Sequence, residues 1–138
     1  MICYLMPIPI LAYAAYWDYR CRIIPNKAAA LLIAVTFLKI ILFNKDDFFI
    51  SASERILGVL VPAMILFLLY KINQRGLGGG DYKLILSLGL FIGISALSTV
   101  LMLACILAIL YCFIKKINAV PFAVPIFISY CFYCCSLV

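Results

Sequence analysis

The sequence predicts an all-α, polytopic integral membrane protein with six transmembrane helices, folded as a single membrane-embedded domain over residues 1–138. Of its residues, 69% are hydrophobic and 12% are charged, whereas a soluble domain averages about 45–50% apolar and about 25% charged residues. A soluble protein of this length cannot bury so much apolar surface, because small domains leave a large fraction of their residues exposed. The apolar residues also fall into long runs separated by short polar segments, which is the pattern of membrane-spanning helices.

Runs with almost no charged residue mark the helices, and they are residues 2–17, 28–43, 56–70, 84–114 and 119–138. The first run has no basic start and no small-residue cleavage site, so we expect a permanent helix rather than a cleaved signal peptide. The second run contains a single charged residue, Lys39. Lys39 lies near the outer end of its helix, where the ammonium group can reach the lipid headgroups.

The fourth run, residues 84–114, is uncharged over 31 residues. A helix that crosses the hydrocarbon core needs about 20 residues, within a range of about 17–25, so this run is too long for one ordinary span. The segment least suited to a continuous membrane helix is "GISALS" at residues 93–98, which contains one glycine and two serines. We therefore predict that the run breaks there into two helices, which brings the number of spans to six.

The charges predict how the six helices are oriented. With six spans, the loops 18–27, 71–83 and 115–118 share one side of the membrane and carry three, three and two basic residues. The opposite side has Lys45 and Arg55, offset by three nearby acids. Basic loops usually face the cytoplasm, so we expect a multi-pass membrane protein with these three loops in the cytoplasm and both termini outside. The sequence has no alternation of aromatic and basic residues, so it does not predict a nucleic-acid-binding surface.

The cysteines do not predict a metal site, and no cofactor is expected. The chain has seven cysteines and no histidine. The "CFYCC" stretch at residues 131–135 has only Tyr and Ser as polar neighbours, and no second ligand pair follows at the spacing of a zinc site. Cysteine in an apolar segment behaves as a small hydrophobic residue, so we expect these side chains to pack or to face lipid.

Two acids meet at one end of this predicted bundle. Asp18 closes the first span and Asp81 opens the fourth, both at the cytoplasmic end. An ionisable side chain at a membrane boundary is costly unless it meets water, a partner or a function. Two neighbouring carboxyl groups can share one proton, so that one activates a water while the other donates a proton. The pattern predicts a catalytic aspartate pair.

Two other interpretations stay open. The first is a Ser-Lys enzyme, because Lys83 and Ser87 are four residues apart and share a helical face, although no oxyanion-hole motif surrounds Ser87. Without histidine, the Ser-His and Cys-His arrangements are excluded. The second is a non-enzymatic transporter subunit or scaffold that uses the two aspartates as a proton or ion relay. Relay acids usually lie in the middle of a span, whereas these lie at helix ends.

Two motifs carry a resemblance to a known family. "GLGGGDYKL" contains a GxGD motif followed by a lysine, and its residues are Gly78, Gly79, Gly80, Asp81 and Lys83. "DYRCRIIPN" runs from Asp18 through basic residues to Pro25 and Asn26. With the weaker match of "VPFAVP" at residues 120–125, nearly the whole chain resembles the type IV prepilin peptidases, which are GxGD intramembrane aspartic proteases. The chain departs from the family in lacking a glycine within that last segment.

The resemblance implies an aspartic endopeptidase of the prokaryotic cytoplasmic membrane that cuts the leader peptide of a type IV prepilin or pseudopilin. The cut would follow a glycine at the cytoplasmic face of the lipid bilayer, with Asp18 and Asp81 as the catalytic dyad and water as the nucleophile. Many relatives carry a methyltransferase domain between their first helices, but only residues 18–27 separate them here. The resemblance is therefore to the short, Tad/Flp-type form without that domain.

The remaining motif residues have structural roles in this interpretation. The glycines let the loop and an extended substrate approach each other closely, because glycine has no side chain. Pro25 and Asn26 are expected to begin the second helix, since proline suits a first turn and asparagine caps a helix well.

Overall fold

Every regular element in the described part of the chain is an α-helix. The computed structural model describes residues 2–43, 48–72, 78–116 and 120–136. The helices are α1 (Ile2–Leu5), α2 (Pro7–Cys21), α3 (Asn26–Phe43), α4 (Phe48–Ile72), α5 (Gly79–Lys115) and α6 (Ala123–Ser136). The predicted all-α class is confirmed for these residues.

A tight turn joins α2 to α3 and brings their ends together. Arg22 ends α2 in the left-handed conformation (φ 54°), and its backbone N–H donates to the Asp18 carbonyl oxygen at 2.9 Å, as in a common helix C-cap. Pro25 precedes the first residue of α3, and its carbonyl oxygen accepts from the N–H of Ala28 at 3.0 Å. Helix α3 thus begins at Asn26, directly after Pro25, which is where the sequence predicts its start; the capping role of Asn26 stays a prediction.

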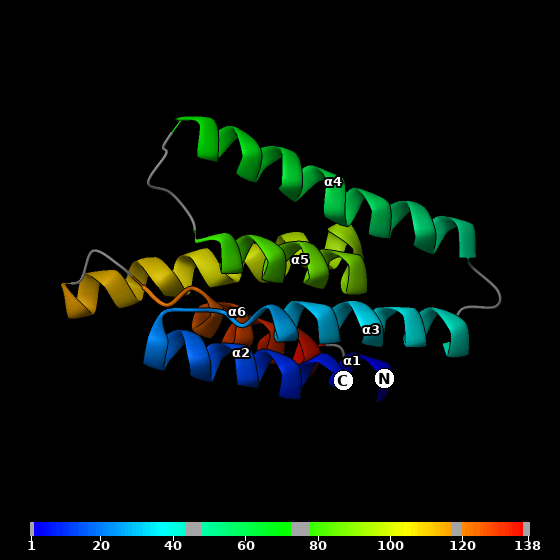
Figure 1. Ribbon diagram of the computed structural model, residues 1–138, viewed down its shortest axis with the longest axis horizontal. Coiled ribbons are helices and arrows are strands. Elements are labelled where there is room, and N and C mark those ends of the chain that lie inside the picture. Colours follow the sequence, from blue (N-terminus) through cyan, green and yellow to red (C-terminus); the bar gives the residue numbers. More distant parts are fainter. Residues whose placement is uncertain (1, 44–47, 73–77, 117–119, 137–138) are drawn as a thin grey trace.

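Helix α5 is interrupted at Gly93, inside the segment where the sequence predicts a break. Gly93 has φ 81° and ψ 174°, a combination that is essentially restricted to glycine. Figure 1 shows the first, green part of α5 and the second, yellow part running in opposite directions. The chain therefore doubles back at Gly93, and both ends of α5 lie at the same end of the bundle.

The core lies around α5, which packs against α3, α4 and α6, while α2 packs against α3 and α6 (Figure 1). Leu84, Leu88 and Phe91 of α5 are almost fully buried. Helices α4 and α5 approach closely at Gly58 and Gly89, where a Cβ atom added to Gly58 would lie 2.6 Å from the Gly89 carbonyl oxygen. Small residues allow such contact between membrane helices.

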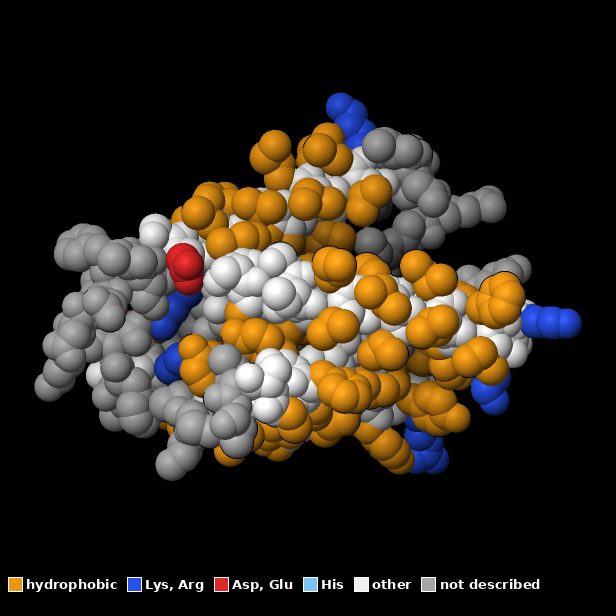
Figure 2. Space-filling view, turned by 180° about the vertical axis from the view of Figure 1, so that it is seen from behind, with side chains coloured by type: hydrophobic (Ala, Val, Ile, Leu, Met, Phe, Trp, Pro, Cys, Tyr) orange, Lys and Arg blue, Asp and Glu red, His pale blue; other side chains and the backbone are white. Residues whose placement is uncertain are grey.

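Two of the described helices are long and apolar enough to cross a membrane, judged by length and composition. They are Ala52–Leu69 and Gly79–Lys115, with mean hydropathies of 1.9 and 2.6, and the second includes the turn at Gly93. Figure 2 shows apolar side chains over much of the face that it draws. Met64 and Phe113 are among the exposed apolar residues, at 69% and 85%. The six-span topology itself stays a prediction.

The structure corrects the prediction for Lys39. Its side chain is 8% exposed and its ammonium nitrogen lies 4.3 Å from the ring centre of Tyr4 and 4.4 Å from that of Phe91. A cation over an aromatic face is stabilised by the ring electrons, most strongly when it is shielded from water. Lys39 therefore points into the bundle rather than towards the headgroups.

Candidate active site

Asp18 lies in the last turns of α2 and is 6% exposed. Its carboxyl oxygen Oδ2 accepts a hydrogen bond of 2.8 Å from the backbone N–H of Ala123, the first residue of α6. The first N–H groups of a helix have no partner within that helix, and they carry partial positive charge. The N-terminus of α6 therefore holds and orients one oxygen of Asp18.

Asp81 lies in the first turn of α5. Its oxygen Oδ1 is buried and accepts no hydrogen bond from the described residues. A buried polar atom without a partner costs about 1–3 kcal/mol, and in native proteins such an atom is uncommon enough to call for an explanation. This oxygen is an acceptor that a water or a peptide group could use.

The fold brings the two carboxyl groups together although they are 63 residues apart in sequence. They come from α2 and α5, and the charge of Asp18 acts electrostatically on Asp81. Two carboxyl groups that interact in this way can divide one proton between them, which is the arrangement that aspartic proteases use. Such a pair could carry out acid–base chemistry on a water.

The segments that follow Asp18 and surround Asp81 also contact each other. A Cβ atom added to Gly80 would lie 2.8 Å from the Cβ of Ile24, so these two backbones meet with no room for a side chain at Gly80. Three residues later, the Lys83 ammonium nitrogen donates to the amide oxygen Oδ1 of Asn26 at 2.9 Å. The two motifs thus form one joined structure beside the carboxyl groups.

The three motif glycines are not equivalent. A Cβ atom at Gly78 would lie 3.4 Å from Asp81 Oδ2, which is an ordinary van der Waals distance, and one at Gly79 would meet no described atom within 4 Å. Close approach therefore explains a glycine at Gly80 but not at Gly78 or Gly79. Pro25 is half-buried in the turn before α3, and its backbone serves that turn rather than the carboxyl groups.

The Ser-Lys pair is not formed in this structure. Ser87 is 3% exposed, and its hydroxyl donates to the Leu84 carbonyl oxygen at 3.0 Å. Lys83 instead makes the hydrogen bond to Asn26 described above. Each member of the pair is therefore engaged by a different partner, and the geometry favours the aspartates as the reactive groups.

Comparison with known proteins shows which family the chain belongs to. A sequence model described as the type IV leader peptidase family matches residues 5–113. The chain belongs to the type IV leader peptidase family. A prepilin leader peptidase/N-methyltransferase of Neisseria gonorrhoeae is 30% identical over 82 residues, covering 56% of this chain and 29% of that protein. The chain thus spans less than a third of the relative's length, and no solved structure matches it.

Sequence reasoning missed one contributor to the site of this leader peptidase family member. Both aspartates and the glycine motif lie within the matched region, whereas Ala123 lies beyond it. Ala123 contributes a backbone N–H, so its side chain gives no sign of the contact. The only available signal was the "VPFAVP" segment at residues 120–125, because the start of α6 falls within it.

Proposed function

We propose that this chain is an intramembrane aspartic endopeptidase that removes the leader peptide of type IV, Flp-like prepilins or pseudopilins. Family membership supports a peptidase, and the name of the Neisseria relative supports a prepilin leader as the substrate. The observation that carries the proposal is the meeting of Asp18 and Asp81, with one buried acceptor oxygen left open at Asp81. We place the cut after a glycine of the substrate at the cytoplasmic membrane face.

In the proposed reaction, the dyad holds one proton between its two carboxyl groups. The ionised carboxylate takes a proton from a water, whose oxygen attacks the carbonyl carbon of the scissile peptide bond. The protonated carboxyl group donates to the carbonyl oxygen, which gives a gem-diol. The carboxyl group that took the proton from water then passes it to the leaving nitrogen as the C–N bond breaks, and the other carboxylate takes a proton from a gem-diol hydroxyl, which restores the shared proton. The N–H of Ala123 keeps Asp18 in a fixed orientation during these transfers, because the reaction depends on aligned groups.

The proposal includes a six-span topology with the aspartates on the cytoplasmic side. The reversal at Gly93 supports two crossings by the two parts of α5. The basic residues Arg20 and Arg22 lie beside Asp18, and Lys83 lies beside Asp81, as the positive-inside rule requires of a cytoplasmic face. Between α2 and α3 only residues 22–25 lie outside helices, which supports the short form without a methyltransferase domain at that position.

The test is co-expression with a candidate prepilin, followed by mass analysis of the prepilin N-terminus. We expect Asp18→Asn and Asp81→Asn each to abolish cleavage at unchanged protein level, because asparagine keeps the shape of aspartate but cannot exchange the proton. The double variant should be no worse than either single variant, since a dyad acts as a unit. Asp46→Asn is the matched control and should cleave like the wild type; Asp46 lies outside the described residues.

The outcomes separate the candidate functions. Normal cleavage by either Asp18→Asn or Asp81→Asn would exclude the dyad. A relay or scaffold predicts that the wild-type chain cleaves nothing. A Ser-Lys enzyme predicts that Ser87→Ala is inactive and that Asp18→Asn is active.

A further inference from the structure

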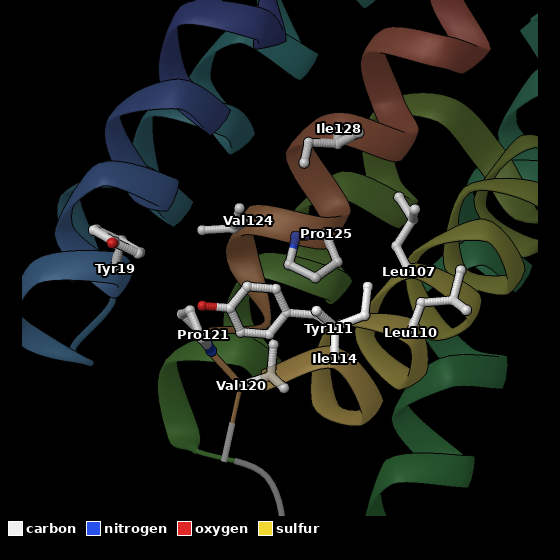
Figure 3. Close-up of a pocket in the computed structure, with 10 residues that line it drawn as sticks. All are labelled: Tyr19, Leu107, Leu110, Tyr111, Ile114, Val120, Pro121, Val124, Pro125 and Ile128. Atoms are coloured by element: carbon white, nitrogen blue, oxygen red, sulfur yellow. The ribbon is translucent and has the colours of Figure 1, made fainter. Parts of the chain in front are cut away.

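An apolar groove of about 350 Å³ lies beside the aspartate site. Figure 3 shows that side chains of the second part of α5 and of the first turns of α6 line it, with Tyr19 of α2 on one side. Leu110 and Ile114 come from α5, and Val124 and Ile128 come from α6. Among the described residues no charged side chain lines the groove, and the polar groups of the lining side chains are the hydroxyls of Tyr19 and Tyr111.

The groove is continuous with the candidate catalytic residues. Tyr19 directly follows Asp18, and Val124 directly follows Ala123, whose N–H holds the Asp18 carboxyl group. The same short segments therefore orient Asp18 on one side and line the groove on the other. Two of the lining residues are therefore the chain neighbours of the two residues that the Asp18 hydrogen bond joins.

The size and chemistry of the groove restrict what it can take. An α-helix with its side chains is about 10–12 Å across, so a groove of this volume holds a few large side chains from one face of a helix rather than the whole helix. Apolar side chains spaced at i, i+3, i+4 and i+7 are the usual anchors of a helix in such a groove. In lipid there is no hydrophobic drive for association, so fit between surfaces decides which helices pair.

We propose that this groove docks an apolar helical segment of the membrane-inserted substrate, immediately beside the peptide bond that is cut. The inference rests on the proposed function, because a polypeptide is the expected occupant of the groove only if Asp18 belongs to a peptidase site. Docking in the groove would fix the position of the substrate relative to the two aspartates. The peptide bond next to the docked segment would then be the bond that is cut. The groove is then a specificity site and takes no part in the chemical step.

The test compares two neighbouring positions on α5. Leu110 lines the groove and is 51% exposed, while Ile109 is 68% exposed and does not line it. Leu110→Trp fills the groove, and Ile109→Trp adds the same bulk to the lipid-facing surface. We expect Leu110→Trp to raise KM for a membrane-inserted prepilin at least tenfold at unchanged kcat, and Ile109→Trp to behave like the wild type. A short leader peptide without the apolar segment should be cut equally by all three proteins.

A second measurement identifies the occupant directly. A photoreactive amino acid is placed at Leu110 or Ile109 in the inactive Asp81→Asn protein, which is then illuminated with prepilin in lipid nanodiscs. We expect prepilin to be crosslinked from the first position and only lipid from the second. Equal KM values for Leu110→Trp and Ile109→Trp, or crosslinking of lipid alone from both, would overturn the inference while wild-type cleavage still supported the peptidase. A wild-type protein that cuts no prepilin would overturn both.

Discussion

A methyl group added at Gly80 should slow cleavage far more than the same change at the adjacent Gly79. In Gly80→Ala the new Cβ would lie 2.8 Å from the Cβ of Ile24 and 3.4 Å from its backbone nitrogen. Carbon atoms in contact lie about 3.5–4.0 Å apart, so the two segments must separate by roughly 1 Å. Both atoms are fixed to the backbone and no rotamer change relieves the contact. Asp81 is the next residue and moves with Gly80.

The expected size of the effect follows from that displacement. A misplacement of about 1 Å in an active site can cost about 100-fold in rate, which corresponds to about 2.7 kcal/mol in the activation free energy. The free energy of unfolding should change less. Alanine stabilises a helix by about 1 kcal/mol relative to glycine, which offsets part of the 1–3 kcal/mol that overpacking typically costs. The loss should therefore appear in kcat/KM and hardly at all in protein level.

The assay is the rate of prepilin cleavage by purified protein in nanodiscs, with thermal melting measured in parallel. Gly79→Ala is the control, because a Cβ there meets nothing within 4 Å. The double variant Gly80→Ala/Ile24→Gly should recover part of the rate, since it removes the opposing Cβ. Equal kcat/KM values for Gly80→Ala and Gly79→Ala would refute the idea that contact between the two segments sets the position of Asp81.

Two further predictions concern the turn in α5 and the bond between the motifs. Gly93→Ala should lower the free energy of unfolding by about 1–3 kcal/mol, because its φ of 81° and ψ of 174° suit glycine alone; a melting temperature equal to that of the wild type would contradict this. Lys83→Ala and Asn26→Ala should each reduce kcat/KM about two- to fivefold, as expected for one partly exposed hydrogen bond. The double variant should be no slower than either single variant. If its loss of kcat/KM equals the product of the two single losses, the hydrogen bond of 2.9 Å does not couple the two segments.

The apolar runs predicted where the helices lie, but not where they end. Helix α5 begins at Gly79 rather than at residue 84, and α4 begins at Phe48 rather than at residue 56. The apolar runs stop short of Asp18 and Asp81, but both residues lie at helix ends, as predicted, in the last turns of α2 and the first turn of α5. The reason is physical: charge marks where a segment leaves the lipid, whereas a helix continues as long as its backbone hydrogen bonds can form. The break at Gly93 was predictable because glycine and serine weaken a helix locally.

The candidate site was predictable only in part. The two aspartates stand out in the sequence because acids are scarce and costly at a membrane boundary. The hydrogen bond from Ala123 was not predictable, since every residue other than proline carries the same backbone N–H. The burial of Lys39 escaped prediction for a related reason, because Tyr4 and Phe91 reach it from other helices. The sequence shows which residues carry charge, but only the folded structure shows which other residues they contact.

The bond between Asp18 and Ala123 has a consequence for the order of synthesis. The two residues are 105 positions apart, and a ribosome makes the chain from the N-terminus. Both aspartates have been translated, and α2 to α5 can insert, before α6 exists to supply the N–H that orients Asp18. On the proposed function, a nascent chain at that stage holds an aspartate pair that α6 does not yet orient, so the capacity to cut would arrive with α6 rather than grow with each helix.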